Sequence, residues 1–207
     1  MKPSLFAATQ NDLNQTESIF NKFKNKFPFL KDKWDKHMSH YHRIDVAAGT
    51  ILLKEGEFSK KAFVIEKGCL RLWFNNNGKD ITFQFFFENE VASSGESFRK
   101  NIPSIFTIEA IEPSIVHWIY KKDLDNIMDE ISNIPQMRDD MRDNAFERQY
   151  DYMGQLLSFI KDSPEQRYLK LLTEKPHIIR RVPQHYIATY LGITPVSLSR
   201  IRKRVGK

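Results

Sequence analysis

The sequence predicts an α+β fold: an antiparallel β domain, then a long helix, then a C-terminal pair of helices joined by a tight turn. Three observations support this prediction. Between Ile44 and about Ile119, short apolar runs alternate with glycine and proline turns, a pattern typical of many short strands. From about Lys122 onward, apolar residues recur three or four positions apart, as they do in helices. Basic residues are concentrated after Pro164.

The segment before the strands runs from about Asn11 to His42 and is polar, with spaced apolar and aromatic residues. This spacing predicts one or two short helices. They would be interrupted at Pro28, because proline lacks the amide hydrogen that a helix interior needs.

The strand segment contains a hairpin. Leu70–Phe74 and Ile81–Phe85 are rich in aromatic and branched residues, and Asn77-Gly78 lies between them. An Asn-Gly pair readily adopts the positive φ angles of a tight hairpin turn. Many short strands at this spacing predict an antiparallel sandwich or barrel.

Two helices should follow, a short one over Asp123–Glu130 and a long one from about Pro135 to Lys161. An apolar stripe runs along the otherwise charged long helix. Its members are Met137, Met141, Ala145, Met153, Leu156, Leu157 and Ile160. A stripe needs a partner, which is either a second copy of the chain or the chain's own sheet. Ser163 and Pro164 suit the N-cap and first position of the next helix, so we place a domain boundary there.

The positive charge of the chain is local. The formal net charge is +6, and the segment from Pro164 to Lys207 holds ten Lys/Arg against two Asp/Glu. A concentrated basic segment attracts polyanions and makes binding salt-dependent. A membrane surface would also attract it, so charge alone does not identify DNA as the partner.

The segment from Gln184 to Lys203 has the residue types of a helix-turn-helix. Ala188 is small enough for the point where two steeply crossing helices touch, and Gly192 can adopt the positive φ of the turn. Ile187 and Leu191 on the first helix would face Leu198 and Ile201 on the second. Thr194 and Pro195 suit the N-cap and first position of the second helix.

The second helix would then expose hydroxyl and guanidinium groups, which suit phosphate contacts and the reading of guanine in the major groove. The alternative is a two-helix element with a solvated basic face. The candidate DNA-binding residues are Thr194, Ser197, Ser199, Arg200, Arg202, Lys203 and Arg204.

The order of these parts resembles the Crp/Fnr superfamily, from about residue 20 to the end. The resemblance rests on Val46–Glu57 with its two glycines, on Ala62–Arg71 with Gly68 at the turn of the β-roll, and on the long helix and helix-turn-helix. It implies a jelly-roll-like β-roll sensor domain over 1–134, a dimerisation helix over 135–163 and a DNA-binding domain over 164–207. It also implies a homodimer on a roughly palindromic double-stranded DNA site.

The resemblance further implies a ligand site. In family members that bind cyclic nucleotides, a Gly-Glu pair precedes a short helix, and an arginine neutralises the phosphate. Gly95-Glu96 matches the pair, but Ser104, Ile105 or Phe106 stands where the arginine should be, and Arg99 and Lys100 lie too early. We therefore expect cyclic AMP to bind weakly or not at all, and expect no cofactor. The candidate ligand-binding residues are Gly95, Glu96, Ser97, Ser104 and Thr107.

Other patterns are interpreted as structural. His37, His40 and His42 cluster, but no carboxylate or cysteine completes a metal site at a convincing spacing, so we expect no metal. Cys69, the single cysteine, lies in an apolar stretch and is expected in the core. No nucleophilic constellation or phosphate-binding loop indicates an enzyme. No membrane helix or signal peptide is evident, so we expect a cytoplasmic protein without a membrane partner.

The sequence thus favours a Crp/Fnr-type transcription regulator. A small-molecule effector and RNA polymerase are the further partners that this interpretation allows. Val196 stands where relatives often carry a glutamate, which indicates a different preferred DNA sequence, with a thymine methyl as a possible contact. The alternative is a small-molecule-binding signalling module whose basic C-terminal domain docks an acidic protein.

Overall fold

The computed structural model describes residues 31–206, together with Asn21, Asn25 and Pro28. Most of the helical prediction for Asn11–His42 lies outside the described residues. Within them, α2 covers Lys31–Met38.

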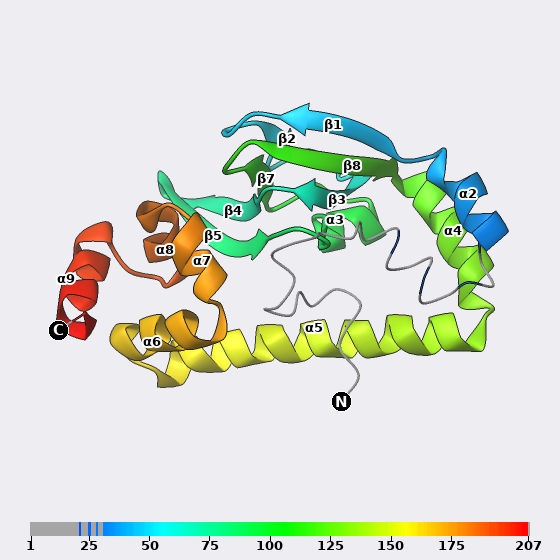
Figure 1. The fold of residues 1–207 in the computed structure, drawn as a ribbon. Coiled ribbons are helices and arrows are strands. Elements are labelled where there is room, and N and C mark those ends of the chain that lie inside the picture. Colours follow the sequence, from blue (N-terminus) through cyan, green and yellow to red (C-terminus); the bar gives the residue numbers. More distant parts are fainter. Residues whose placement is uncertain (1–20, 22–24, 26–27, 29–30, 207) are drawn as a thin grey trace. The chain divides into compact units, whose positions relative to one another are not determined.

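The β domain consists of short strands and one short helix, in the order that the turn residues predict (Figure 1). The strands are β1 (His42–Val46), β2 (Ile51–Leu53), β3 (Lys61–Lys67), β4 (Leu70–Asn76), β5 (Lys79–Phe86), β6 (Val91–Ala92), β7 (Thr107–Ala110) and β8 (Ser114–Tyr120). Helix α3 (Gly95–Lys100) lies between β6 and β7. The helical segment comprises α4 (Lys121–Ser132), α5 (Pro135–Lys161), α6 (Pro164–Glu174), α7 (Pro176–Arg181), α8 (Gln184–Tyr190) and α9 (Pro195–Val205).

The strands form two four-stranded sheets, in the orders β1-β8-β3-β6 and β2-β7-β4-β5. The pairings of β8 with β1 and with β3 are antiparallel. The predicted hairpin is present as β4 and β5, and Asn77 and Gly78 have φ angles of 52° and 81° in its turn. The predicted fold class, an antiparallel jelly-roll-like domain followed by helices, is confirmed.

Gly68 shows why the turn between β3 and β4 needs a glycine. Its φ is 106°, and a Cβ at this position would lie 2.1 Å from Ser114 Oγ. No side chain fits there without moving β8. The glycine pattern in the sequence therefore reflects a close approach of two strands as well as a turn.

The chain divides into two compact units, which are described separately. The first comprises the residues up to Arg71 together with Phe86–Glu147, and the second comprises Leu72–Phe85 with Arg148–Lys207. The division into 1–134, 135–163 and 164–207 stays a prediction.

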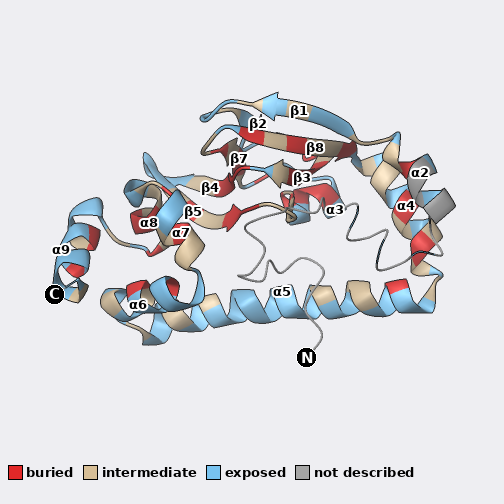
Figure 2. Cartoon of the chain, viewed as in Figure 1, coloured by how far each residue is buried: buried red, intermediate tan, exposed pale blue. Residues whose placement is uncertain are grey.

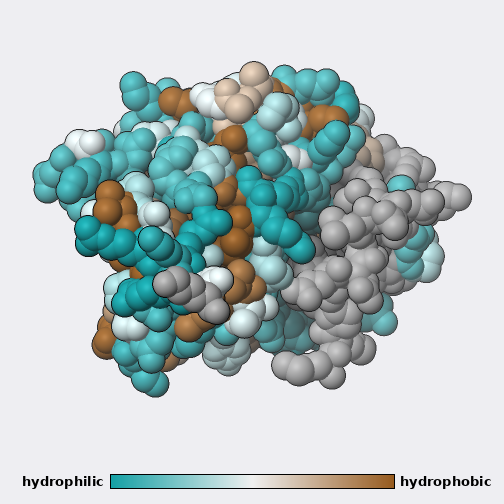
Figure 3. All heavy atoms as spheres, turned by 60° about the vertical axis from the view of Figure 1, so that its left-hand side comes forward, coloured by the Kyte–Doolittle hydropathy of each residue, from teal (hydrophilic) through white to brown (hydrophobic). Residues whose placement is uncertain are grey.

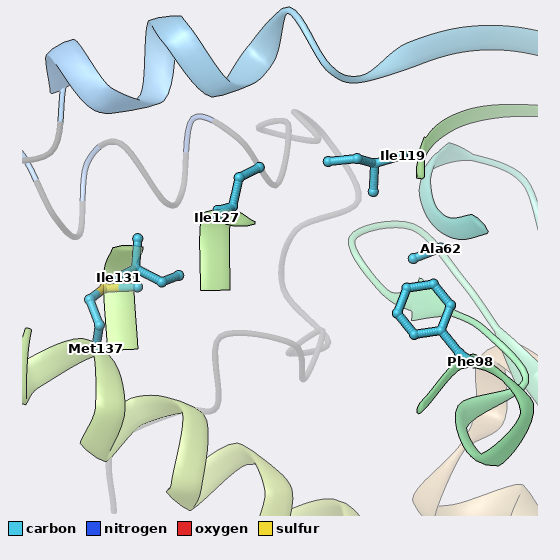
Figure 4. Close-up of a cluster of buried hydrophobic side chains, with 6 residues drawn as sticks. All are labelled: Ala62, Phe98, Ile119, Ile127, Ile131 and Met137. Atoms are coloured by element: carbon cyan, nitrogen blue, oxygen red, sulfur yellow. The ribbon is translucent and has the colours of Figure 1, made fainter. Parts of the chain in front are cut away.

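In the first unit, a hydrophobic cluster joins α3, α4 and the start of α5 to the β domain (Figure 4). Its buried members are Ala62, Phe98, Ile119, Ile127, Ile131 and Met137. Tyr41 packs against this cluster, and burial raises the pKa of its phenol to about 12. The cluster anchors the first turn of α5, which begins at Pro135 as predicted.

In the second unit, α6, α8 and α9 each contain buried residues, whereas most residues of α5 are exposed (Figure 2). Hydrophilic side chains predominate on the face drawn in Figure 3, and hydrophobic ones form smaller areas. Within the described part of the chain, no helix combines the length and the apolar character needed to cross a membrane.

Candidate nucleic-acid interface

Helices α8 and α9 pack against each other through the apolar residues that the sequence indicates. Ala188 is fully buried, and Ile187, Leu198 and Ile201 are each no more than 3% exposed. Gly192 in the intervening turn has a φ of 68°, and a Cβ there would lie 2.9 Å from Phe159 Cε1. The small residue, the turn glycine and the apolar pairs thus have the predicted positions.

The start of α9 is fixed by Thr194. Its Oγ1 accepts a hydrogen bond from the backbone amide of Ser197 at 3.1 Å and lies 2.9 Å from Ser197 Oγ. Pro195 occupies the first helical position. Thr194 is therefore an N-cap, as predicted, and its hydroxyl and that of Ser197 are partly engaged with each other.

The other predicted DNA-binding residues distribute around the exposed part of α9. Successive helical residues are about 100° apart, so Ser199, Arg200 and Lys203 share the face opposite the buried pair. Val196 lies on the same face and is 61% exposed. Arg202 falls on one flank, and Ser197 and Arg204 fall on the other. The exposed face thus presents one apolar, one hydroxyl and two cationic side chains.

A residue that sequence reasoning missed, Arg167 on α6, ties the turn to the end of α5. Its guanidinium donates to the carbonyl oxygen of Leu191 at 3.0 and 3.2 Å and to that of Asp162 at 2.8 Å. The guanidinium also lies over the Phe159 ring, 4.9 Å from the ring centroid. The turn before α9 is therefore held by a charged group on a neighbouring helix. Nothing in the local sequence pattern of α6 could have indicated this distant contact.

Asp162, at the junction of α5 and α6, is held by two donors. Ser158 Oγ donates to Asp162 Oδ2 at 2.6 Å, and Lys170 Nζ donates to the same oxygen at 2.5 Å. The hydrogen bond from Lys170, followed by that from Ser158, lowers the pKa of this carboxyl below its ordinary value. Ser163 caps α6 in a capping box with Gln166, as the Ser-Pro pair predicts.

The hairpin residues of the second unit contact α8 and α5. Thr82 Oγ1 lies 2.9 Å from Thr189 Oγ1, and the rings of Phe85 and Tyr190 lie 5.3 Å apart. Tyr152 Oη donates to Gln84 Oε1 at 2.9 Å. The hairpin is thus attached both to the long helix and to the first helix of the α8–α9 pair, a connection with no signal in the sequence.

The predicted ligand-binding residues form a different environment. Gly95 and Glu96 are exposed at the start of α3, and Glu96 Oε1 pairs with Lys100 Nζ at 2.7 Å. Ser97 is 2% exposed, and its hydroxyl donates to the carbonyl oxygen of Ile102 and accepts from the amide of Ser59 at 2.9 Å. The Ser97 hydroxyl therefore joins helix α3 to the neighbouring backbone inside the protein.

Ser104 and Thr107 are similarly engaged. Ser104 Oγ accepts from the amide of Phe106 at 3.0 Å and lies 2.8 Å from Ser94 Oγ. Thr107 Oγ1 accepts from the amide of Glu55 at 3.0 Å. Both residues are no more than 3% exposed. Arg71, a buried cation of this domain, pairs through Nη2 with Glu109 Oε2 at 2.7 Å.

The three clustered histidines have separate partners. His37 Nε2 lies 2.9 Å from Glu130 Oε2, His40 Nδ1 lies 3.5 Å from Asp123 Oδ1, and His42 stacks on Trp118 with centroids 4.3 Å apart. Among the described residues, no group of three or more His, Cys, Asp or Glu side chains is arranged to hold a metal ion.

Residues 43–130 match the cyclic nucleotide-binding domain family. No curated protein matches the chain. Together with the solved structures below, this match confirms the fold that the resemblance to the Crp/Fnr superfamily implies.

Three solved structures illustrate the shared fold. The chain is similar to CLP, the c-di-GMP responsive global regulator of Xanthomonas campestris, with a TM-score of 0.66, 13% identity and coverage of 85% of this chain and 91% of that one. FixK2 of Bradyrhizobium japonicum has a TM-score of 0.67 and 14% identity, with coverage of 80% and 84%. A CooA mutant of Carboxydothermus hydrogenoformans has a TM-score of 0.63 and 14% identity, with coverage of 82% and 79%. At these identities the likeness shows the fold.

Proposed function

We propose that the protein is a homodimeric transcription regulator of the Crp/Fnr type, which binds double-stranded DNA through α9 and is not an enzyme. The observation that carries this proposal is the capped, exposed α9, which presents Arg200 and Lys203 on one face. Arginine and lysine donate well to guanine and to phosphates, and a helix of about three turns packed crosswise on another fits the major groove.

Selection of bound sequences from random DNA tests this proposal. The wild-type protein should enrich one motif made of two half-sites. Arg200→Ala should lose or relax discrimination at one position per half-site, by about 1–3 kcal/mol. Arg138→Ala, an exposed α5 residue of the first unit, is the control and should leave the motif unchanged. Failure to enrich any motif would favour the alternative, a signalling module whose basic domain docks an acidic protein.

The dimer is supported by a seam on α5. Phe146, Tyr150, Met153, Leu157 and Ile160 are 48–72% exposed and follow one another at intervals of four, three, four and three residues. This is the spacing of a coiled-coil stripe. Tyr152 and Gln155, which contact the hairpin, lie on the opposite side of the helix. The hairpin therefore leaves the seam uncovered, which favours a second copy over packing on the chain's own sheet.

Sedimentation equilibrium tests the seam. Wild-type protein should be a dimer, and Leu157→Glu should shift it toward the monomer because two charges would be buried against each other. Asp151→Asn, an exposed change on the same helix, should remain dimeric. A monomeric wild type would contradict this part of the proposal.

We further propose that the β domain does not bind cyclic AMP in the usual way and needs no cofactor. The hydroxyls of Ser97, Ser104 and Thr107 are occupied within the protein, and the buried Arg71 pairs with Glu109. A phosphate without a cationic partner loses a hydrogen bond to a charged group, worth about 1.5–3 kcal/mol. Calorimetry with cyclic AMP and cyclic GMP tests this, and saturable binding with a Kd below ~10 μM would contradict it.

Regulation would pass from the β domain to α9 through the long helices, which set the spacing of the two recognition helices in a dimer. The hairpin contacts with α5 and α8 and the Arg167 contacts with the turn support this route. An effector of another chemical class and RNA polymerase are the further partners that this function allows.

A further inference from the structure

A groove of about 830 Å³ lies between the start of α6 and one flank of α9. Arg200, Lys203 and Arg204 line it from α9, and Glu165 lines it from α6. Three cations and one carboxylate thus face the same space, next to the surface that the proposed function assigns to DNA. The three cations are candidate DNA-binding residues by their sequence pattern, whereas no pattern indicates a role for Glu165.

Glu165 engages one of these cations directly. Its Oε2 lies 2.9 Å from Arg204 Nη2, and the side chains of Glu165 and Arg204 are 38% and 65% exposed. Exposed ion pairs of this kind contribute little to stability, because water solvates both partners well. In the first turn of α6, the carboxylate also lies near the positive end of the helix dipole. Neither the small contribution of the ion pair to stability nor the interaction of Glu165 with the helix dipole explains why its partner is an arginine on α9.

A carboxylate on a guanidinium makes the same kind of charge-assisted hydrogen bond that a DNA phosphate makes. While Glu165 holds Arg204, the pair has no net charge and adds nothing to the neutralisation of DNA. A phosphate that enters the groove competes with Glu165 for the same donor. This competition is effective only when the DNA backbone approaches closely, as it does when the bases are being read.

We propose that Glu165 is a specificity-determining residue, which pairs with Arg204 and so prevents it from contacting loosely bound DNA. In a non-specific complex, Arg204 stays paired with Glu165. In a specific complex, a phosphate in the groove displaces the carboxylate and gains Arg204. This inference rests on the proposed DNA-binding function and adds that Arg204 discriminates between two modes of binding.

The salt dependence of binding to random duplex DNA and to the selected site tests the inference. Each additional phosphate contact steepens the slope of log K against log salt by about 0.9. Glu165→Gln should steepen the slope for random DNA by about 0.9 per protomer in contact, and should raise that affinity roughly fivefold near 0.1 M salt. Affinity for the selected site should rise less than twofold, so the ratio of specific to non-specific affinity should fall.

Glu174→Gln is the matched control, because it removes an exposed carboxylate from the other end of α6 and changes the net charge equally. It should leave both slopes unchanged. Equal effects of the two variants would show a general effect of net charge and would overturn the inference. If Glu165→Gln had no effect on either slope, the inference would also be overturned.

Arg204→Gln tests the contribution of the cationic partner of the Glu165–Arg204 pair. Alone, it should weaken binding to both kinds of DNA, because it also leaves the carboxylate of Glu165 unpaired beside the DNA. In the Glu165→Gln background it should weaken both. Relative to the wild type, the double variant keeps the net charge of the pair at zero, so it should bind random DNA with unchanged affinity and the selected site more weakly. Loss of affinity for random DNA in the double variant would overturn the inference.

The two proposals fail in different ways. If α9 does not read DNA, the wild-type protein enriches no motif and Arg200→Ala changes nothing. If only the role of Glu165 is wrong, the wild type enriches its motif and the two glutamate variants behave alike.

Discussion

The region around α3 and β7 and the α8–α9 pair use polar side chains in opposite ways. Ser97, Ser104 and Thr107 are buried in the first region, and each hydroxyl is satisfied by a nearby backbone group. Arg200 and Lys203 in the second region are exposed on a helix whose apolar face is buried. Residues of the first kind stabilise the fold, whereas those of the second kind are available to a partner.

The comparison therefore separates the effects that substitutions should have. Changes near α3 should lower stability without altering the DNA contact surface. Changes on the exposed face of α9 should alter DNA binding at little cost in stability. The turn between α8 and α9 belongs to both categories, because it fixes the orientation of the exposed helix.

The largest effect should come from Gly192→Ala. The residue has a φ of 68°, and its new Cβ would lie 2.9 Å from Phe159 Cε1. A left-handed conformation and a displaced aromatic ring together should cost about 2–5 kcal/mol in the free energy of unfolding. Urea denaturation measures this loss. Gly154→Ala is the control, because a Cβ there meets nothing within 4 Å and should stabilise helix α5 slightly.

Ser104→Ala should have the next largest effect and tests the buried region. It would remove the acceptor of the Phe106 amide and the partner of Ser94, both in a buried setting. We expect a loss of about 1–3 kcal/mol in the free energy of unfolding. Ser199→Ala, on the exposed face of α9, should change stability by less than about 0.5 kcal/mol and should instead weaken DNA binding. Equal stability losses in the two variants would remove the distinction between the regions.

Thr194→Ala should have an intermediate effect on both properties. The hydroxyl satisfies the amide of Ser197 at the start of α9, so its loss should cost about 1 kcal/mol in stability. Frayed ends present side chains less regularly, so affinity for the selected DNA should also fall. Thr194→Ser retains a capping hydroxyl and should behave as wild type in thermal unfolding and in DNA binding.

The contrast also explains what the sequence could predict. Where the residues of one helix are enough to define its buried and exposed faces, the local sequence pattern predicts them. Helix α5, the cap at Thr194 and the buried pair Leu198 and Ile201 were therefore predictable. The roles of Arg167 and Glu165 depend on contacts with residues 24 and 39 positions away, and no periodicity encodes such contacts. The same holds for Ser104, which could be named as a ligand candidate but whose partners are set by the fold.

The smallest expected effect concerns pH and the junction that supports α9. Hydrogen bonds from Lys170 and Ser158 lower the pKa of Asp162 below its ordinary value of 3.8. A depressed folded-state pKa stabilises the protein above the unfolded-state pKa, and this stabilisation is lost as the pH falls through the folded-state value. The free energy of unfolding should therefore decline below about pH 4, and Asp162→Asn should lessen this decline. Thermal unfolding between pH 3 and pH 6 measures both slopes. Parallel curves for the two proteins would show that the carboxylate of Asp162 adds nothing to the stability of the junction between α5 and α6, which Arg167 also links to the turn before α9.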